Sequence, residues 1–203
     1  MIYGVDLYHG DAMLDVGQYD FVFHKATQGA WFIDPACQER MATVRAAGKL
    51  AGMYHFMTTD EPIKAQVDFF LATAQPRRSD VLVLDFENDG KWANIANLDL
   101  AAMATSFMNE LQLSAEFHRV LIYCNRNNYD NIVKPFGVPL GDGLWVAESL
   151  SEPQLGQLFW QYNSDVVDHD KGYFPSLQTA RQWADELTQI PPGPAQQSML
   201  LED

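Results

Sequence analysis

One apolar run that ends in two acids constrains this chain more than any other segment. Residues 80–88 read DVLVLDFEN, and the Val and Leu content is typical of a strand buried on both faces. Side chains alternate along a strand, so Asp85 and Glu87 are predicted on one face and Phe86 on the other. A buried carboxylate is costly to ionise without partners. The pair therefore indicates either a structural hydrogen-bond network or a catalytic site.

The composition is that of one globular domain with an acidic surface. Of the 203 residues, 47% are hydrophobic and 12% aromatic, which fits a folded α/β domain and argues against disorder. The net charge is −14. Nucleic acids and anionic membrane surfaces bind basic patches, so we expect neither as a partner. No apolar run is long enough for membrane insertion.

The cysteines and histidines carry no metal or disulfide signature. Cys37 and Cys124 have neither C-x-x-C nor zinc-type spacing, which favours two buried free thiols. The histidines include no H-x-x-x-H pair. We therefore expect no metal site and no cofactor.

Strand and helix patterns alternate along the first part of the chain. The predicted strands cover 2–8, 21–27, 50–57, the acidic run, and 119–124, and the predicted helices cover 35–47, 61–74 and 97–113. After a short helical segment over 128–133 come bare strands over 144–148, 158–162 and 165–170, then an amphipathic helix over 176–187. Strand–helix units in series predict a parallel sheet with right-handed crossovers. The bare strands predict an incomplete, TIM-like β/α barrel.

Polar side chains gather near the C-terminal ends of the predicted strands. They are Asp6, Lys25, His55, Asp85, Glu87 and Tyr123. A TIM-like barrel places its active site at this end, whereas a purely structural network has no preference for one end. This distribution favours a catalytic site built around the acid pair.

The same segments, in order and spacing, resemble glycoside hydrolase family 25, the Chalaropsis-type lysozymes or N-acetylmuramidases. The matching fragments are GVD at 4–6, FHKATQG at 23–29, AGMYHF at 51–56, LDFE at 84–87, WVA at 145–147 and WQY at 160–162. The resemblance covers residues 2–174 and implies a flattened barrel that lacks some helices. By position, it implies Glu87 as the catalytic acid with Asp85 and Asp6 beside it, and Asp168 as a further acid.

Three positions depart from the family pattern. Gln28 replaces the usual Glu, and Glu148 stands where an aromatic or small residue is common. Residues 168–174 follow the family's D-x-N pattern only loosely. The departures leave the acid pair untouched and bear on the substrate contacts. We expect one catalytic domain over residues 1–190 and a flexible tail over 191–203.

The resemblance implies a peptidoglycan hydrolase that cleaves the β-1,4 bond between N-acetylmuramic acid and N-acetylglucosamine. Glu87 would protonate the leaving oxygen, with its pKa raised by a neighbouring carboxylate and by apolar walls such as Phe86 and Phe56. Asp85 would orient the substrate's 2-acetamido group, and Asp6 would tune the pair. The predicted substrate-binding residues are Tyr54, His55, Lys25, Tyr123, Trp145, Gln161, Tyr162, Trp31 and Asp168. Two of these, His55 and Lys25, are also expected as partners of the acids.

Two other classes remain open. A chitinase-like glycosidase also uses a D-x-E motif on a barrel strand, and a non-catalytic sugar-binding protein would retain the groove. We expect a monomer whose partner is the peptidoglycan glycan strand. Residues 1–6 lack the pattern of a signal peptide, so we expect synthesis in the cytoplasm and action on the cell wall or in the periplasm after release. A phage endolysin fits this route, and so does a delivered toxin with a neutralising immunity protein.

Overall fold

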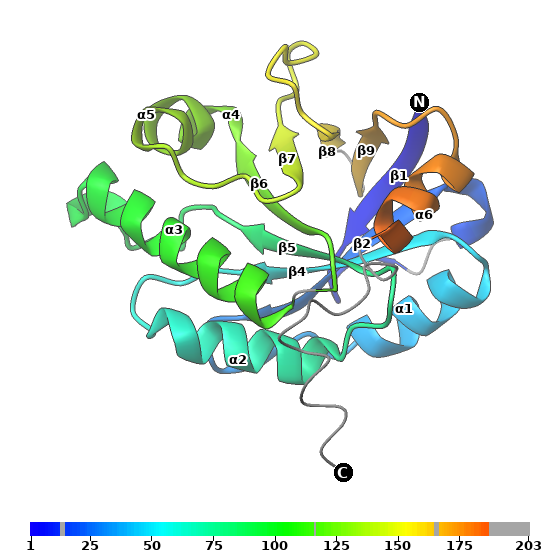
Figure 1. Cartoon of the computed structure of the whole chain (residues 1–203), viewed down its shortest axis with the longest axis horizontal. Coiled ribbons are helices and arrows are strands. Elements are labelled where there is room, and N and C mark those ends of the chain that lie inside the picture. Colours follow the sequence, from blue (N-terminus) through cyan, green and yellow to red (C-terminus); the bar gives the residue numbers. More distant parts are fainter. Residues whose placement is uncertain (13–14, 116, 165–166, 187–203) are drawn as a thin grey trace, which may run out of the picture.

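The acid-bearing strand is one of eight strands that close a barrel (Figure 1). The computed structural model describes residues 1–12, 15–115, 117–164 and 167–186. Around the ring the strands are β1 (Ile2–Leu7), β2 (Phe21–Gln28), β4 (Leu50–Phe56), β5 (Val81–Asp85), β6 (Val120–Asn125), β7 (Gly143–Ala147), β8 (Phe159–Ser164) and β9 (Asp168–Gly172). A ninth strand, β3 (Phe32–Ile33), pairs with β2 outside the ring. The predicted α/β barrel in a single domain is confirmed.

One strand of the ring runs against the others. β1, β2 and β4 to β8 are parallel, but β9 is antiparallel to both of its neighbours, β8 and β1. The short β3 is antiparallel to β2 as well. The expectation of an all-parallel sheet is therefore wrong here. A parallel connection needs a dozen or more residues, whereas β8 ends at Ser164 and β9 begins at Asp168.

Helices cover only part of the outside of the barrel. The helical elements before β7 are α1 (Cys37–Ala46), α2 (Ile63–Ala74), α3 (Asn97–Ser114), α4 (Arg126–Asn128), a π-turn (Tyr129–Val133) and α5 (Lys134–Phe136), together with two short 3-10 turns over Val16–Gln18 and Trp92–Asn94. In Figure 1, α2 and α3 lie beside β4 and β5, whereas a loop joins β7 to β8. The prediction of missing helices is thus met on the β7–β8 side. Among the described residues, none of the helices has both the length and the apolar character needed to cross a bilayer.

The last helix, α6 (Leu177–Asp185), closes the N-terminal end of the barrel. Its buried Ala180 and Ala184 belong to the same apolar cluster as the residues inside the barrel. Arg119, which directly precedes β6, donates to the Trp183 carbonyl oxygen at 2.8 Å. The helix was predicted from its pattern over 176–187, and its place at the base of the barrel was not. The predicted tail over 191–203 lies outside the described residues.

Two apolar cores occupy the two sides of the sheet. The acidic strand contributes Val81 and Val83 to the inner core, and Leu82, Leu84 and Phe86 to the outer core under the helices. This is the predicted alternation. It also places Phe86 against Trp92, with ring centroids 4.8 Å apart, on the side away from the carboxylates. The expectation that Phe86 forms a wall of the acid site is therefore wrong. The two cysteines, Cys37 and Cys124, are buried free thiols, as predicted.

Candidate active site

A small cavity of about 80 Å³ lies inside the barrel at the C-terminal ends of the strands. Its lining residues are Asp6, Tyr54, Asp85, Glu87, Tyr123, Trp145, Gln161 and Asp168. All eight are among the predicted site residues, and they come from, or directly follow, every strand of the ring except β2. The barrel thus brings together acids that are far apart in the sequence.

Glu87 occupies the loop that directly follows β5, and its side chain is half-buried. Burial raises the pKa of Glu87, and the nearby charge of Asp168 adds to this rise. The Asn125 side chain opposes it by donating a hydrogen bond to Glu87 Oε1 at 3.4 Å. A carboxyl group with a raised pKa holds its proton closer to neutral pH, which is the state that a general acid needs.

Asp85 lies deeper than Glu87, with only 5% of its surface exposed. Burial raises its pKa well above the usual range, and the charge of Glu87 raises it further, whereas Lys25 lowers it. Within the part of the chain that the structure describes, Asp85 Oδ1 has no hydrogen-bond partner. An unsatisfied buried oxygen is unfavourable. The Asp85 side chain nevertheless lines the cavity.

Asp6 belongs to a second pair of acids, and its partner was not predicted. Asp6 accepts a hydrogen bond from Gln161 Nε2 at 2.8 Å. Asp6 and Asp170 interact closely, and burial, with their mutual charge, raises the pKa of Asp170 well above its usual range; burial raises the pKa of Asp6 as well. Asp170 is fully buried and also accepts from Trp145 Nε1 at 2.8 Å. Strand alternation was the available signal, since Asp168 and Asp170 share one face of β9.

The aromatic residues of the cavity are fixed by hydrogen bonds and ring contacts. Tyr123 donates to Gln161 Oε1 at 2.9 Å, and Tyr54 donates to the Leu7 carbonyl oxygen at 3.1 Å. Both rings contact Trp145, with centroids 4.4 and 6.2 Å away. The walls around the acids are therefore rigid before any ligand binds.

His55 does not belong to the site, although it was predicted there. Its ring is fully buried on the opposite side of the sheet, stacked on Phe107 with centroids 5.0 Å apart. It is hydrogen-bonded to Thr27 Oγ1 at 2.8 Å and to Gln66 Oε1 at 3.2 Å. Burial lowers its pKa to about 4, so the ring is neutral. The physical reason is alternation: Tyr54 faces the cavity, and its neighbour along the strand must face the helices.

Lys25 and Trp31 differ in their relation to the acids. The positive charge of Lys25 interacts with Asp85 and Glu87, in agreement with its interpretation as a charge partner. Lys25 Nζ also donates to Gln28 Oε1 at 2.7 Å. Because Gln28 is neutral, this bond does not neutralise the lysine, and its charge still interacts with the acids. Trp31 is 63% exposed and does not line the cavity, so its contact with substrate stays a prediction.

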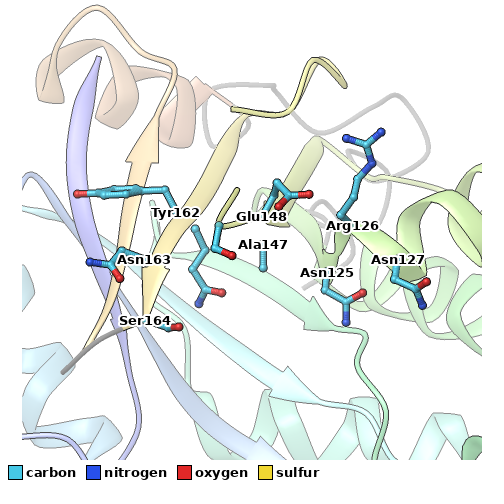
Figure 2. A pocket seen from close by; sticks show the side chains of 10 residues that line it. Asn125, Arg126, Asn127, Ala147, Glu148, Tyr162, Asn163 and Ser164 are labelled. Atoms are coloured by element: carbon cyan, nitrogen blue, oxygen red, sulfur yellow. The ribbon is translucent and has the colours of Figure 1, made fainter. Parts of the chain in front are cut away.

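A larger pocket of about 400 Å³ lies beside the cavity, where β6, β7 and β8 end (Figure 2). It is lined by Asn125, Arg126, Asn127, Ala147, Glu148, Ser149, Gln161, Tyr162, Asn163 and Ser164. Gln161 lines both spaces, and Asn125 bonds to Glu87. We call this space the outer pocket. It includes Tyr162, which was predicted to line the groove.

The fold and the cavity together define a class of protein. A barrel with paired carboxyl groups at the C-terminal strand ends has the arrangement that glycosidases use to cleave a bond between sugars. A comparison with family models then identifies the family, because the model of the glycosyl hydrolases family 25 matches residues 8–171. The chain belongs to this family and is a glycosidase. The resemblance seen in the sequence is confirmed.

Solved structures show the same fold at low sequence identity. A bacterial lysozyme from Streptomyces coelicolor superposes with a TM-score of 0.79 at 20% identity, over 92% of this chain and 98% of that one. A family 25 lysozyme from Aspergillus fumigatus gives a TM-score of 0.76 at 23% identity, over 90% and 98%. The catalytic domain of an endolysin from a Listeria monocytogenes bacteriophage gives 0.71 at 14%, over 89% and 97%. Among the curated proteins, the search found no match.

Proposed function

We propose that this glycosidase hydrolyses peptidoglycan at the β-1,4 bond between N-acetylmuramic acid and N-acetylglucosamine, with Glu87 as general acid. Family membership and the likeness to lysozymes and endolysins support peptidoglycan as the substrate. The observation that carries the choice of Glu87 is its position. It is the half-buried acid of the cavity that follows a barrel strand and whose pKa is raised by burial.

The roles of the other acids follow from their surroundings. Protonation of the leaving oxygen by Glu87 leaves positive charge on the sugar, which nearby carboxylates stabilise. Asp85 orients the substrate's 2-acetamido group, because its carboxyl group lines the cavity and can accept a hydrogen bond from the acetamido N–H. Asp6, held by Gln161 and Asp170, tunes the charge of the cavity.

The size of the two spaces suggests how the substrate lies. The acid cavity, at about 80 Å³, is too small for a whole sugar, whereas the outer pocket, at about 400 Å³, falls within the range of ligand sites. The scissile bond therefore lies over the acids, and neighbouring parts of the substrate occupy the outer pocket.

The test is the variant Glu87→Gln, which keeps the shape and removes the proton. Loss of a general acid lowers the rate by roughly 10²–10⁴-fold. We expect this loss in a turbidity assay on purified cell walls, with an unchanged melting temperature. Glu39→Gln, at an exposed acid of α1, is the matched control. A Glu87→Gln variant that still lyses walls would show that another group is the acid.

The bond and the substrate need separate measurements. Mass spectrometry of digested peptidoglycan should find N-acetylmuramic acid at the new reducing ends. N-acetylglucosamine at those ends would contradict the proposed bond. Faster release from chitin than from peptidoglycan would favour the chitinase-like alternative, and tight glycan binding without products would favour the sugar-binding one.

The proposed place of action is the cell wall or the periplasm. The likeness to a phage endolysin supports a role in cell wall lysis. We expect a monomer, which size-exclusion chromatography with light scattering would test. Co-purification with a small neutralising protein would point to the delivered-toxin variant of this role.

A further inference from the structure

Two opposite charges line the outer pocket. Arg126 follows β6 and Glu148 follows β7, and Figure 2 shows both side chains projecting at the pocket. The negative charge of Glu148 acts on Arg126. The remaining polar lining consists of amides and hydroxyl groups. A pocket with both signs of charge and neutral hydrogen-bonding groups suits a ligand that carries both signs itself.

Hydrogen bonds hold Glu148 in place at the end of its strand. Its backbone N–H donates to the Gln161 carbonyl oxygen at 3.1 Å, and its carbonyl oxygen accepts from Trp160 Nε1 at 2.7 Å. Its side-chain Oε1 accepts from the Leu150 N–H at 3.0 Å. The carboxylate is therefore presented to the pocket in a defined position, at one of the sequence positions that depart from the family pattern.

Arg126 is oriented as well. Its Nε donates to Asp130 at 2.6 Å, with 41% of each side chain exposed. This bond uses one of the five guanidinium donors, and the fork of terminal nitrogens is suited to a carboxylate. In a chain with a net charge of −14, a guanidinium at this place also offsets repulsion of an anionic group.

The outer pocket is continuous with the acid cavity through two side chains. Gln161 lines both spaces and donates to Asp6. Asn125 lines the pocket and donates to Glu87. A group attached to the sugar over the acids can therefore reach the pocket.

We propose that the outer pocket binds the peptide stem of peptidoglycan, with an ammonium group of the stem on Glu148 and a carboxylate on Arg126. This inference rests on the proposed function. The N-acetylated sugar rings are neutral, so they gain little from either charge. The stem branches from the muramic acid next to the scissile bond, and its diamino acid carries both charges. Its amide groups match the side chains of Asn127 and Asn163.

The experiment compares two substrates, one with the stem and one in which its hydrolysis has left the free lactyl carboxylate of muramic acid. One is purified peptidoglycan with intact stems, and the other is the same glycan after an amidase has removed them. The variants are Glu148→Gln and Arg126→Gln, and the controls are Glu39→Gln and Arg78→Gln at exposed sites away from the pocket. On stem-bearing glycan we expect each pocket variant to lower kcat/KM about 10-fold, the size of one charged hydrogen bond. On stem-free glycan we expect changes below about 2-fold by the same measure.

Other outcomes overturn the proposal. An equal loss on both substrates would make the outer pocket a sugar site. De-N-acetylated glycan serves as a third substrate. A loss for Glu148→Gln alone, present only on this glycan, would make an amino sugar the source of the ammonium. No loss on either substrate would mean that the substrate does not use these charges.

A binding measurement separates this inference from the proposed function. The probe is a tripeptide of L-alanine, D-glutamate and diaminopimelate, titrated calorimetrically into the full chain. If the tripeptide binds, and binds less well to both pocket variants, the stem site stands even where no glycan is cleaved. If glycan is cleaved but the tripeptide does not bind and stems do not affect the rate, the proposed function stands and the stem site fails.

Discussion

The two ends of the barrel interior are built from the same strands and differ in almost every other respect. The N-terminal end is filled by aromatic rings, where Phe21, Phe23 and Phe159 contact one another with centroids 5.0–5.2 Å apart. The C-terminal end holds carboxyl groups around a small cavity. The inward face of β5 shows this change, from Val81 and Val83 to Asp85.

The difference explains how several acids can be kept close together. The aromatic end excludes water from below, so burial is the largest cause of the raised pKa values of Asp6, Asp85 and Glu87. The same packing holds Trp145 against Phe23, with centroids 5.1 Å apart. The aromatic packing at the N-terminal end thus holds the carboxyl groups at the C-terminal end in defined positions.

The largest expected effect on stability comes from the loss of an aromatic ring at the N-terminal end of the barrel interior. Phe23→Ala removes a fully buried side chain, and such changes cost about 3–5 kcal/mol of unfolding free energy. Urea denaturation would measure the change, with Phe117→Ala, at a residue that is 41% exposed, as the control. A decrease in unfolding free energy below about 1 kcal/mol would show that the aromatic N-terminal end does not stabilise the barrel.

The second test asks whether His55 takes part in the acid cavity or lies only on the outer face of the sheet near the same strand end. His55→Ala leaves Thr27 Oγ1 without its partner and removes a buried ring that stacks on Phe107, so we expect a loss of about 2–3 kcal/mol in stability. Activity per folded molecule should change less than about 2-fold, as for residues outside a site. A 10-fold loss of activity in a stable variant would return His55 to the site.

The contribution of His55 to the free energy of unfolding should change with pH in one direction. The folded pKa is lowered to about 4, below the unfolded value of about 6.5. The stability that the neutral ring contributes is therefore full above about pH 6.5 and is lost as the pH falls toward 4. The difference between the parent chain and His55→Ala should narrow over this range in urea titrations.

The smallest expected effect concerns Asp170, the buried acid that was not predicted. Asp170→Asn keeps an acceptor for Trp145 and a donor for Asp6 without a titrating group. Because the folded pKa of Asp170 is raised, its favourable contribution is complete below the unfolded value of about 3.9 and is lost as the pH rises. We expect the variant to be more stable by about 1 kcal/mol at neutral pH and to gain nothing in acid.

Urea denaturation from pH 3 to 8 would measure this gain. The control is Asp99→Asn, an exposed acid in the first turn of α3, which should change stability by less than about 0.5 kcal/mol. A gain that does not vary with pH would mean that the titration of Asp170 does not affect the stability of the fold.

The sequence predicted the barrel and most of the cavity because both depend on local patterns. The order of strands and helices, and the acids at strand ends, can be read from alternation and spacing. Position along a strand was predictable, but the face was not always read correctly. His55 was placed at the site because it is near a strand end, although Tyr54 beside it already faces inward.

What the sequence did not predict depends on contacts between distant segments. The pattern of α6 predicts a helix but not its docking at the base of the barrel, which rests on Arg119 and on the inner core. Asp170 looks like a surface acid in a short polar strand. Only the pairing of β9 with β1 places it inside, beside Asp6.

The pairing of β1 with β9 also governs when the enzyme can act. Asp6 and Asp168 are direct partners across these two strands, one near the start of the chain and the other near the end of its last strand. A nascent chain cannot complete the ring until Gly172 has left the ribosome. Asp6 and Asp168 therefore meet only once synthesis has passed β9, so a partly made chain cannot hold the complete cavity.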